Sequence, residues 1–223
     1  YVDTTFLSTE DSWYRVTARD NANPQNESEF SSTVSYSAPA ATGTNAARIA
    51  AILNGRTPHF SLGQPADPVT TREVTVTTAA QFNTEAAVSG TLIRINSSFS
   101  GSVNITASDI DVVMSNTATV TGDLTIPSNG FSRFRWTGGN ITGTIGIARG
   151  NDVLFDDVYI DEPDDSYNAI IADGNSRFAF INSTFYRSES GSSFDAWTFY
   201  TFNQAAPNRH TDLLIGNCLF SGD

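Results

Sequence analysis

The sequence predicts an all-β protein in which the C-terminal two thirds of the chain form a β-solenoid. A phrase of the form apolar, any, apolar, any, then Asn, Asp or Gly recurs five times in the 223 residues. Its copies occupy residues 112–116, 134–138, 153–157, 178–182 and 213–217, and they start 22, 19, 25 and 35 residues apart. A period of about 20 residues with growing insertions is typical of a solenoid built from stacked coils.

A second apolar series lies between these copies and indicates at least two strands in each coil. It comprises the pairs Val103/Ile105, Leu124/Ile126 and Ile145/Ile147, followed by Ile170. The copies themselves are closed by apolar residues at Val120, Ile141, Ile160, Phe185 and Phe220. Because side chains alternate along a strand, each strand turns one set of side chains inward. Coils stacked about 4.8 Å apart would then bury a continuous apolar column.

The last residue of each copy is expected to lie at a turn between strands. These residues are Asn116, Gly138, Asp157, Asn182 and Asn217. Asparagine tolerates a left-handed backbone conformation and can hydrogen-bond to the neighbouring coil. Glycine suits the same place because it has no Cβ to clash.

Residues 78–87 predict a helix ahead of the first coil, with Thr78 as N-cap and Phe82 and Ala86 on one face. This helix and the repeats that follow resemble the pectin-lyase-like superfamily over about residues 74–223. The resemblance implies a right-handed parallel β-helix with an N-terminal capping helix. It does not imply one activity, because that superfamily includes lyases, hydrolases, phage tailspikes, adhesins and inert spacers.

Residues 1–38 predict a fragment of a second β domain. The stretches 12–20 and 28–36 alternate large and small side chains on either side of a turn-rich segment. They resemble the last two strands of a fibronectin type III domain, which implies a remnant of such a β-sandwich. Two strands are not stable alone. We therefore expect this remnant to pair with other domains of the same longer polypeptide or to pack on the solenoid.

Residues 39–70 predict a linker that contains a short helix over 45–53, with Asn45 as its N-cap. The third region, 71–223, is the β-helix. It is expected to be truncated at its C-terminus, because Asp223 falls directly after a strand.

Charge and composition exclude several classes of partner. With 24 acidic residues, 12 arginines and no lysine, the net charge is −12. Such a surface repels nucleic acid and anionic lipid. No run of about 18 apolar residues is present for membrane insertion. The acidic surface suits an extracellular protein, so we expect a secreted or cell-surface protein. The single cysteine, Cys218, allows no intramolecular disulfide and is expected to be a buried small side chain.

Acidic side chains gather where the connections between strands lengthen, and Asp161, Asp164 and Asp165 are the site candidates among them. Carboxylates supply oxygen ligands of the kind that Ca2+ prefers, so Ca2+ is the cofactor that this group suggests. Two such carboxylates can instead act as the acid and base of a glycosidase. The alternative is a set of solvated turns on an acidic protein.

Aromatic residues follow in the largest excursion of the chain. Phe194, Trp197 and Tyr200 have flat faces that suit stacking on sugar rings. The alternative is that the excursion folds back and uses them as a small local core.

Three arginines, Arg177, Arg187 and Arg209, lie near these groups and suit an acidic glycan. The resemblance to pectate-lyase-like enzymes implies an arginine or lysine that abstracts a proton, and Arg187 is the candidate for that role. No lysine is present to complete the Lys/Arg pair of alginate-lyase-like β-helices.

Taken together, the sequence favours a β-helix that binds a polysaccharide or cell-surface glycan, with cleavage by lyase or glycosidase chemistry left open. The alternative is a non-catalytic structural or adhesive solenoid in an extracellular fibre, stalk or adhesin. Further coils with long loops and paired Asp, Lys or His would favour an enzyme, whereas uniform short coils would favour a scaffold.

Overall fold

The chain forms two compact units, Tyr1–Ala41 and Thr42–Asp223. The computed structural model describes residues 12–14, 34–36, 43–58, 60–127, 132–148, 151–162, 169–172, 176–187, 199–202 and 211–222. In the first unit, β1 (Ser12–Tyr14) pairs antiparallel with β2 (Val34–Tyr36), and Trp13 lies opposite Ser35. The rest of the two predicted strands lies outside the described residues.

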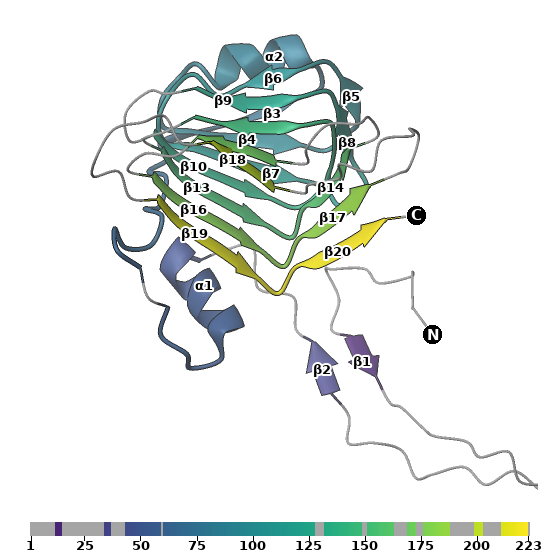
Figure 1. The fold of residues 1–223 in the computed structure, drawn as a ribbon. Helices are drawn as coiled ribbons and strands as arrows, with labels where there is room; N and C mark the ends of the chain where they lie inside the picture. The colour runs from purple at the N-terminus through teal and green to yellow at the C-terminus, as the bar shows by residue number, and fades with distance from the viewer. Residues whose placement is uncertain are drawn as a thin grey trace, which may run out of the picture. The chain divides into compact units, whose positions relative to one another are not determined.

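The second unit is a parallel β-solenoid of about five turns (Figure 1). The seven-stranded sheet contains β3 (Arg72–Val76), β4 (Thr91–Ile95), β7 (Ile110–Met114), β10 (Ser132–Thr137), β13 (Asn151–Asp156), β16 (Ser176–Ile181) and β19 (Thr211–Gly216). The six-stranded sheet contains β5 (Phe99–Ser100), β8 (Thr119–Thr121), β11 (Asn140–Thr142), β14 (Tyr159–Glu162), β17 (Thr184–Arg187) and β20 (Leu219–Gly222). The five-stranded sheet contains β6 (Val103–Asn104), β9 (Leu124–Ile126), β12 (Ile145–Ile147), β15 (Ala169–Ala172) and β18 (Phe199–Phe202). Each of the five complete coils, from β4–β6 to β16–β18, therefore contributes one strand to each of three sheets.

The strand register confirms most of the predicted repeat. All five closing apolar residues stack in one column of the six-stranded sheet. The first copy was aligned wrongly, because Phe134 lies opposite Ile110 and Trp136 opposite Val112. The reason is the turn after β7, which spans 115–118, whereas the turn after β10 spans only 138–139. By register, residues 114–118 correspond to 138–139, so this connection has three extra residues. The predicted pattern allowed for one of them, and the other two shift the strand by two positions.

The second apolar series is confirmed up to Ile147 and then differs by one residue. Ile145 lies opposite Ala169, and Ile147 lies opposite Ile171. Ile170 instead shares the register position of Gly146. The register position of Ile126 and Ile147 therefore continues at Ile171.

The turns between the seven- and six-stranded sheets adopt the predicted left-handed conformation in four coils. The residues with positive φ are Gly138 (78°), Asp157 (59°), Asn182 (51°) and Asn217 (53°). Asn217 Nδ2 donates to Asn182 Oδ1 at 2.7 Å, so the predicted bond between coils is present. Asn116 does not share this conformation, because its turn is longer; its Oδ1 instead accepts from the N–H of Gly139 at 3.4 Å.

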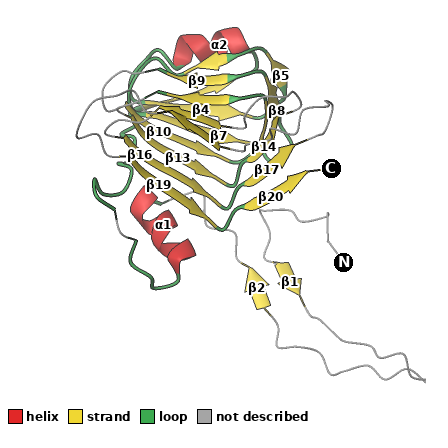
Figure 2. Ribbon diagram, viewed as in Figure 1, coloured by secondary structure: helices red, strands yellow, loops and turns green. Residues whose placement is uncertain are grey.

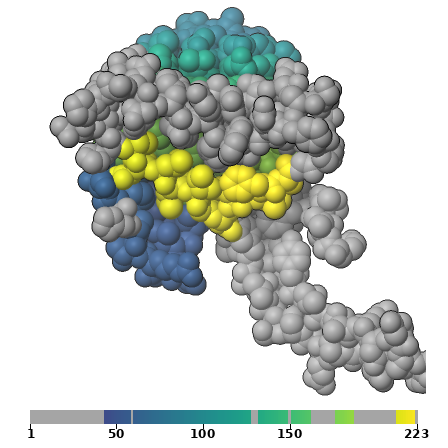
Figure 3. Space-filling view, in the orientation of Figure 1, coloured from purple at the N-terminus to yellow at the C-terminus, as the bar shows by residue number. Residues whose placement is uncertain are grey.

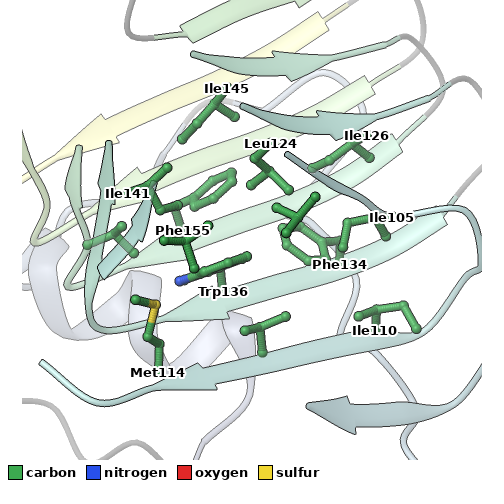
Figure 4. Packing of buried hydrophobic residues seen from close by; sticks show 14 of the residues in the cluster. Ile105, Ile110, Met114, Leu124, Ile126, Phe134, Trp136, Ile141, Ile145 and Phe155 are labelled. Atoms are coloured by element: carbon green, nitrogen blue, oxygen red, sulfur yellow. The ribbon is translucent and has the colours of Figure 1, made fainter. Parts of the chain in front are cut away.

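Aromatic side chains fill the interior of the middle coils (Figure 4). Phe134, Trp136 and Phe155 are completely buried, and each such burial stabilises the fold by about 1.5–3 kcal/mol. The rings of Phe155 and Phe180 stack with centroids 5.1 Å apart. Trp136 Nε1 donates to the carbonyl of Gly138 at 3.1 Å, which satisfies its only polar group.

Helix α2 (Ala79–Glu85) lies at the end of the solenoid where the first coil begins (Figure 2). Thr78 is its N-cap, as predicted, and accepts a hydrogen bond from the N–H of Gln81. Phe82 is fully buried and packs on Phe99 and Trp136, with ring centroids 6.5 and 5.8 Å apart. The helix thus closes the apolar column at that end.

At the opposite end the apolar column reaches solvent. The side chains of Leu213, Ile215 and Phe220 in this column are 37%, 39% and 49% exposed, and the neighbouring outward side chain of Leu219 is 58% exposed. They belong to β19 and β20, which Figure 3 shows in yellow at the molecular surface.

Replacing Gly138 by alanine is expected to lower the free energy of unfolding by at least about 1–3 kcal/mol, because a Cβ there forces a left-handed alanine. That Cβ would also lie 2.5 Å from the carbonyl oxygen of Met114. Gly43→Ala is the matched control, since no atom lies within 4 Å of its added Cβ. Urea unfolding of both variants is the measurement. Equal midpoints would contradict the assigned turn.

Candidate functional site

The connections between the six- and five-stranded sheets lengthen abruptly in the later coils. In the first three coils they span only 101–102, 122–123 and 143–144, whereas the next two span 163–168 and 188–198. The strands on both sides remain in register: Glu162 lies opposite Arg187, and Ala169 lies opposite Phe199. The two long connections therefore start and finish at adjacent positions of one corner. We call this corner, from Asp161 to Ala169 and from Tyr186 to Tyr200, the loop corner.

Seven of the nine predicted site residues belong to the loop corner. Asp161 lies at the end of β14, opposite Thr142 on one side and Tyr186 on the other. Arg187 ends β17, and Tyr200 in β18 lies opposite Ile170. The remaining four, Asp164, Asp165, Phe194 and Trp197, fall in the two connections and lie outside the described residues.

Beside Asp161 lies an aromatic pair that the sequence did not single out. The rings of Tyr159 and Tyr186 stack with centroids 6.0 Å apart and an interplanar angle of 25°. Each tyrosine is next to a buried residue of the closing apolar column, Ile160 or Phe185, and alternation along the strand places both on the outer face of the six-stranded sheet. The sequence does contain a signal for this pair, because each tyrosine lies next to a residue of the closing apolar column.

Arg177 lies on a different face from the loop corner. It belongs to β16, and its guanidinium forms a two-point ion pair with Asp152, with N–O distances of 2.5 and 2.6 Å. Its Nη1 also donates to the carbonyl of Leu62 at 3.4 Å. Arg209 lies outside the described residues, in the connection between β18 and β19.

The carbonyl of Leu62 belongs to a segment that covers the outer face of the seven-stranded sheet. This segment, residues 43–70, is called the strap. Its helix α1 (Asn45–Leu53) packs Ile49 on Leu154 and Ile181. Thr44 is the N-cap of α1, one residue earlier than predicted.

Asn45 does not cap α1 because its side chain is used elsewhere. Its amide nitrogen donates to the carbonyls of Pro65 and Ala66, at 3.2 and 3.0 Å. These bonds join the two ends of the strap. The composition suggested a linker over this stretch. Residues 43–70 are instead part of the solenoid unit.

Charges alternate from coil to coil beneath the strap. The residues are Asp109 and Asp111, then Arg133 and Arg135, then Asp152, Arg177 and Asp212. Arg133 pairs with Asp109 at 2.6 Å, and Arg135 pairs with Asp111 at 2.5 Å. The sequence carries this signal, because the outward position ahead of each apolar core residue alternates in sign.

The same charges hold the backbone of the strap. The carboxylate of Asp212 accepts the N–H groups of Ser61 and Leu62, and Arg135 donates to the carbonyl of Gly43 at 2.8 Å. Burial by itself lowers the pKa of Arg135, but hydrogen bonds and the negative charge of Asp111 raise it above its ordinary value overall. These arginines therefore serve structure on this face.

One ion pair between the strap and the sheet is buried. Arg48 Nη1 lies 2.5 Å from Asp156 Oδ2, and the two side chains are only 3% and 1% exposed. The other carboxylate oxygen of Asp156 accepts from Asn182 Nδ2 at 2.8 Å. Asp156 thereby connects α1 to the column of turn residues.

Cys218 is half-buried against the apolar column, in line with the expected small side chain. Burial raises the pKa of its thiol, and the backbone hydrogen bonds around it only partly offset this. A raised pKa keeps the thiol protonated and weakly nucleophilic near neutral pH.

Arg48→Ala is expected to lower the free energy of unfolding by about 3–5 kcal/mol, because it leaves the buried carboxylate of Asp156 without its cation. Arg94→Ala is the matched control. It removes an arginine whose pair with Glu73 is exposed, and it is expected to leave the midpoint unchanged. The measurement is urea unfolding, with protease cleavage of the strap as a second readout. An unfolding midpoint of Arg48→Ala equal to that of Arg94→Ala would contradict the stabilising role of the buried Arg48–Asp156 ion pair.

Within the described ranges, no three His, Cys, Asp or Glu side chains come together as a metal site. Neither described helix is long and apolar enough to cross a bilayer. No protein-family model, curated protein or solved structure matches the chain. The side chains of the loop corner are therefore the basis for inferring a function.

Proposed function

We propose that the chain is part of a secreted or cell-surface multidomain protein whose β-helix binds polysaccharide at the loop corner. The observation that carries this proposal is the growth of two successive connections at one corner, with their anchors in register. In solenoids, insertions on one face often form the binding face. The two connections are anchored in adjacent coils, and a glycan that contacts both would span these coils.

The composition of the two connections supports a sugar ligand. The first, 163–168, contains Asp164 and Asp165, and the second, 188–198, contains Phe194 and Trp197. Carboxylates accept hydrogen bonds from sugar hydroxyls or hold Ca2+. Aromatic rings cover the C–H faces of a pyranose at low entropic cost.

The proposal includes the finer identity of the fold. Three parallel sheets, left-handed turns and helix α2 with its buried Phe82 support a right-handed β-helix of the pectin-lyase-like kind, with α2 as its N-terminal cap. The antiparallel pairing of β1 and β2 supports a fibronectin type III remnant.

Cleavage of the glycan would need catalytic residues in addition to the binding role proposed for the loop corner. A glycosidase needs an acid and a base among Asp161, Asp164 and Asp165, at the separation that sets the stereochemical outcome. A lyase needs Arg187 to abstract the proton, because the chain has no lysine. We therefore propose binding and treat cleavage as a separate test.

A scaffold role is the second candidate, and the compact coils favour it. The first three coils join the six- and five-stranded sheets by connections of only two residues. The strap donates backbone hydrogen bonds to Asp109, directly before β7, and to Asp212 in β19, and it thereby connects coils along the seven-stranded sheet. Such a rigid rod suits a stalk or fibre subunit.

A binding screen separates the two candidates. The purified chain is titrated with neutral and acidic polysaccharides, with and without Ca2+, while tryptophan fluorescence is recorded. We expect a saturable change with at least one polysaccharide, and we expect Trp197→Ala to weaken binding about tenfold through loss of one aromatic contact. Trp13→Ala, in the other unit, is the matched control and is expected to bind normally.

Two further readouts test the extensions of the proposal. Product analysis by chromatography detects cleavage, and a rise in melting temperature with Ca2+ detects a bound ion. The absence of binding to any glycan, with a melting temperature unchanged by Ca2+, would contradict the proposal and favour the scaffold.

A further inference from the structure

The outer face of the six-stranded sheet differs from that of the seven-stranded sheet. Its described side chains are almost all hydroxyl, amide or phenol groups, and we call it the tyrosine face. They form two rows along the solenoid: Thr119, Asn140, Tyr159, Thr184 and, in the last coil, the apolar Leu219, and beside them Ser100, Thr121, Thr142, Asp161, Tyr186 and Ser221. Figure 1 shows the strands of this sheet stacked edge to edge, from β5 to β20.

No strap was found over this sheet among the described residues. The strap makes its contacts with the seven-stranded sheet, where it buries Arg48 and Ile49. On the tyrosine face, Tyr159 is 36% exposed, and Thr121 and Ser221 are exposed as well. The polar rows are therefore accessible over several coils.

The two tyrosines form an offset pair across adjacent coils. Tyr159 lies opposite Thr184, two residues before Tyr186, so the rings meet diagonally between the rows. A centroid distance of 6.0 Å lies in the range of offset stacking, which leaves part of each ring face uncovered. The pair thus supplies an aromatic strip that spans two coils.

The charge on this face selects the class of sugar. Asp161 is the one charged residue among its described side chains, and it is acidic. The arginines described on the seven-stranded sheet are paired with aspartates there. A polyuronate would meet like charge, whereas a neutral chain offers hydroxyls that match both rows.

We infer that the tyrosine face binds a neutral polysaccharide chain that runs across the strands, parallel to the solenoid axis. Tyr159 and Tyr186 contact the sugar rings, and the neighbouring threonines donate hydrogen bonds to sugar hydroxyls and accept hydrogen bonds from them. This inference rests on the proposed function, and it names both the substrate class and the surface that continues from the loop corner. Asp161 belongs to both.

Affinity electrophoresis in gels containing neutral glucan, galactomannan or xylan tests the inference, with alginate and polygalacturonate as acidic counterparts. Tyr159→Ala and Tyr186→Ala are each expected to weaken neutral-glycan binding about three- to tenfold. Tyr159→Phe is expected to retain the ring contact and most of the affinity. Thr75→Ala, an exposed outward position on the seven-stranded sheet, is the matched control.

A second measurement on the unaltered chain covers the case in which an alanine variant does not fold. Nitration by tetranitromethane, mapped by mass spectrometry, is expected to slow at Tyr159 and Tyr186 when neutral glycan is present. Unchanged nitration of both residues at saturation would overturn the inference.

The outcomes separate this inference from the proposed function. If Trp197→Ala weakens binding while both tyrosine variants bind normally, the loop corner stands and the tyrosine face is wrong. Tighter binding of acidic glycans than neutral ones would also overturn the inference. If no glycan binds, the proposed function fails and this inference fails with it.

Discussion

The register of the stacked coils is the constraint on which the rest of the structure depends. Parallel ladders fix each strand opposite the same positions of its neighbours, and a slip of one residue would turn the apolar column outward. The buried aromatics from Phe134 to Phe185 oppose such a slip, because every inward position is filled. Left-handed turns at Gly138, Asp157 and Asn182 then hold the sheets at a constant angle from coil to coil.

Because the buried interior sets the strand register, it also determines which side chains lie on each outer face. On the seven-stranded sheet, register places Asp opposite Arg in successive coils, and the strap completes their hydrogen bonds. On the six-stranded sheet, the same register produces rows of hydroxyls and the Tyr159–Tyr186 pair. One face is thereby covered by the chain itself, and the other remains accessible beside the loop corner.

Periodicity made the interior predictable from the sequence. The closing column from Val120 to Phe220 was placed correctly, because every residue in it is apolar and the turns before four of its members have equal length. The first copy was misaligned because the turn at 115–118 is longer, and turn length is invisible to an apolar pattern. The strap was not predicted to dock, since several of its anchors are backbone groups, such as the N–H of Ser61 and the carbonyl of Gly43, that carry no residue signature. At the site, proximity in sequence joined Arg177 to the loop residues, whereas alternation along β16 places it on the opposite side of the strand from Phe178.

Amide hydrogen exchange with and without saturating neutral polysaccharide tests the central claim most directly, because it reads both outer faces in one experiment. The account predicts slower exchange in β14, β17 and the connections 163–168 and 188–198, with no change in the strap at 43–70. Protection confined to the strap, or to the seven-stranded sheet beneath it, would contradict the assignment of the binding surface.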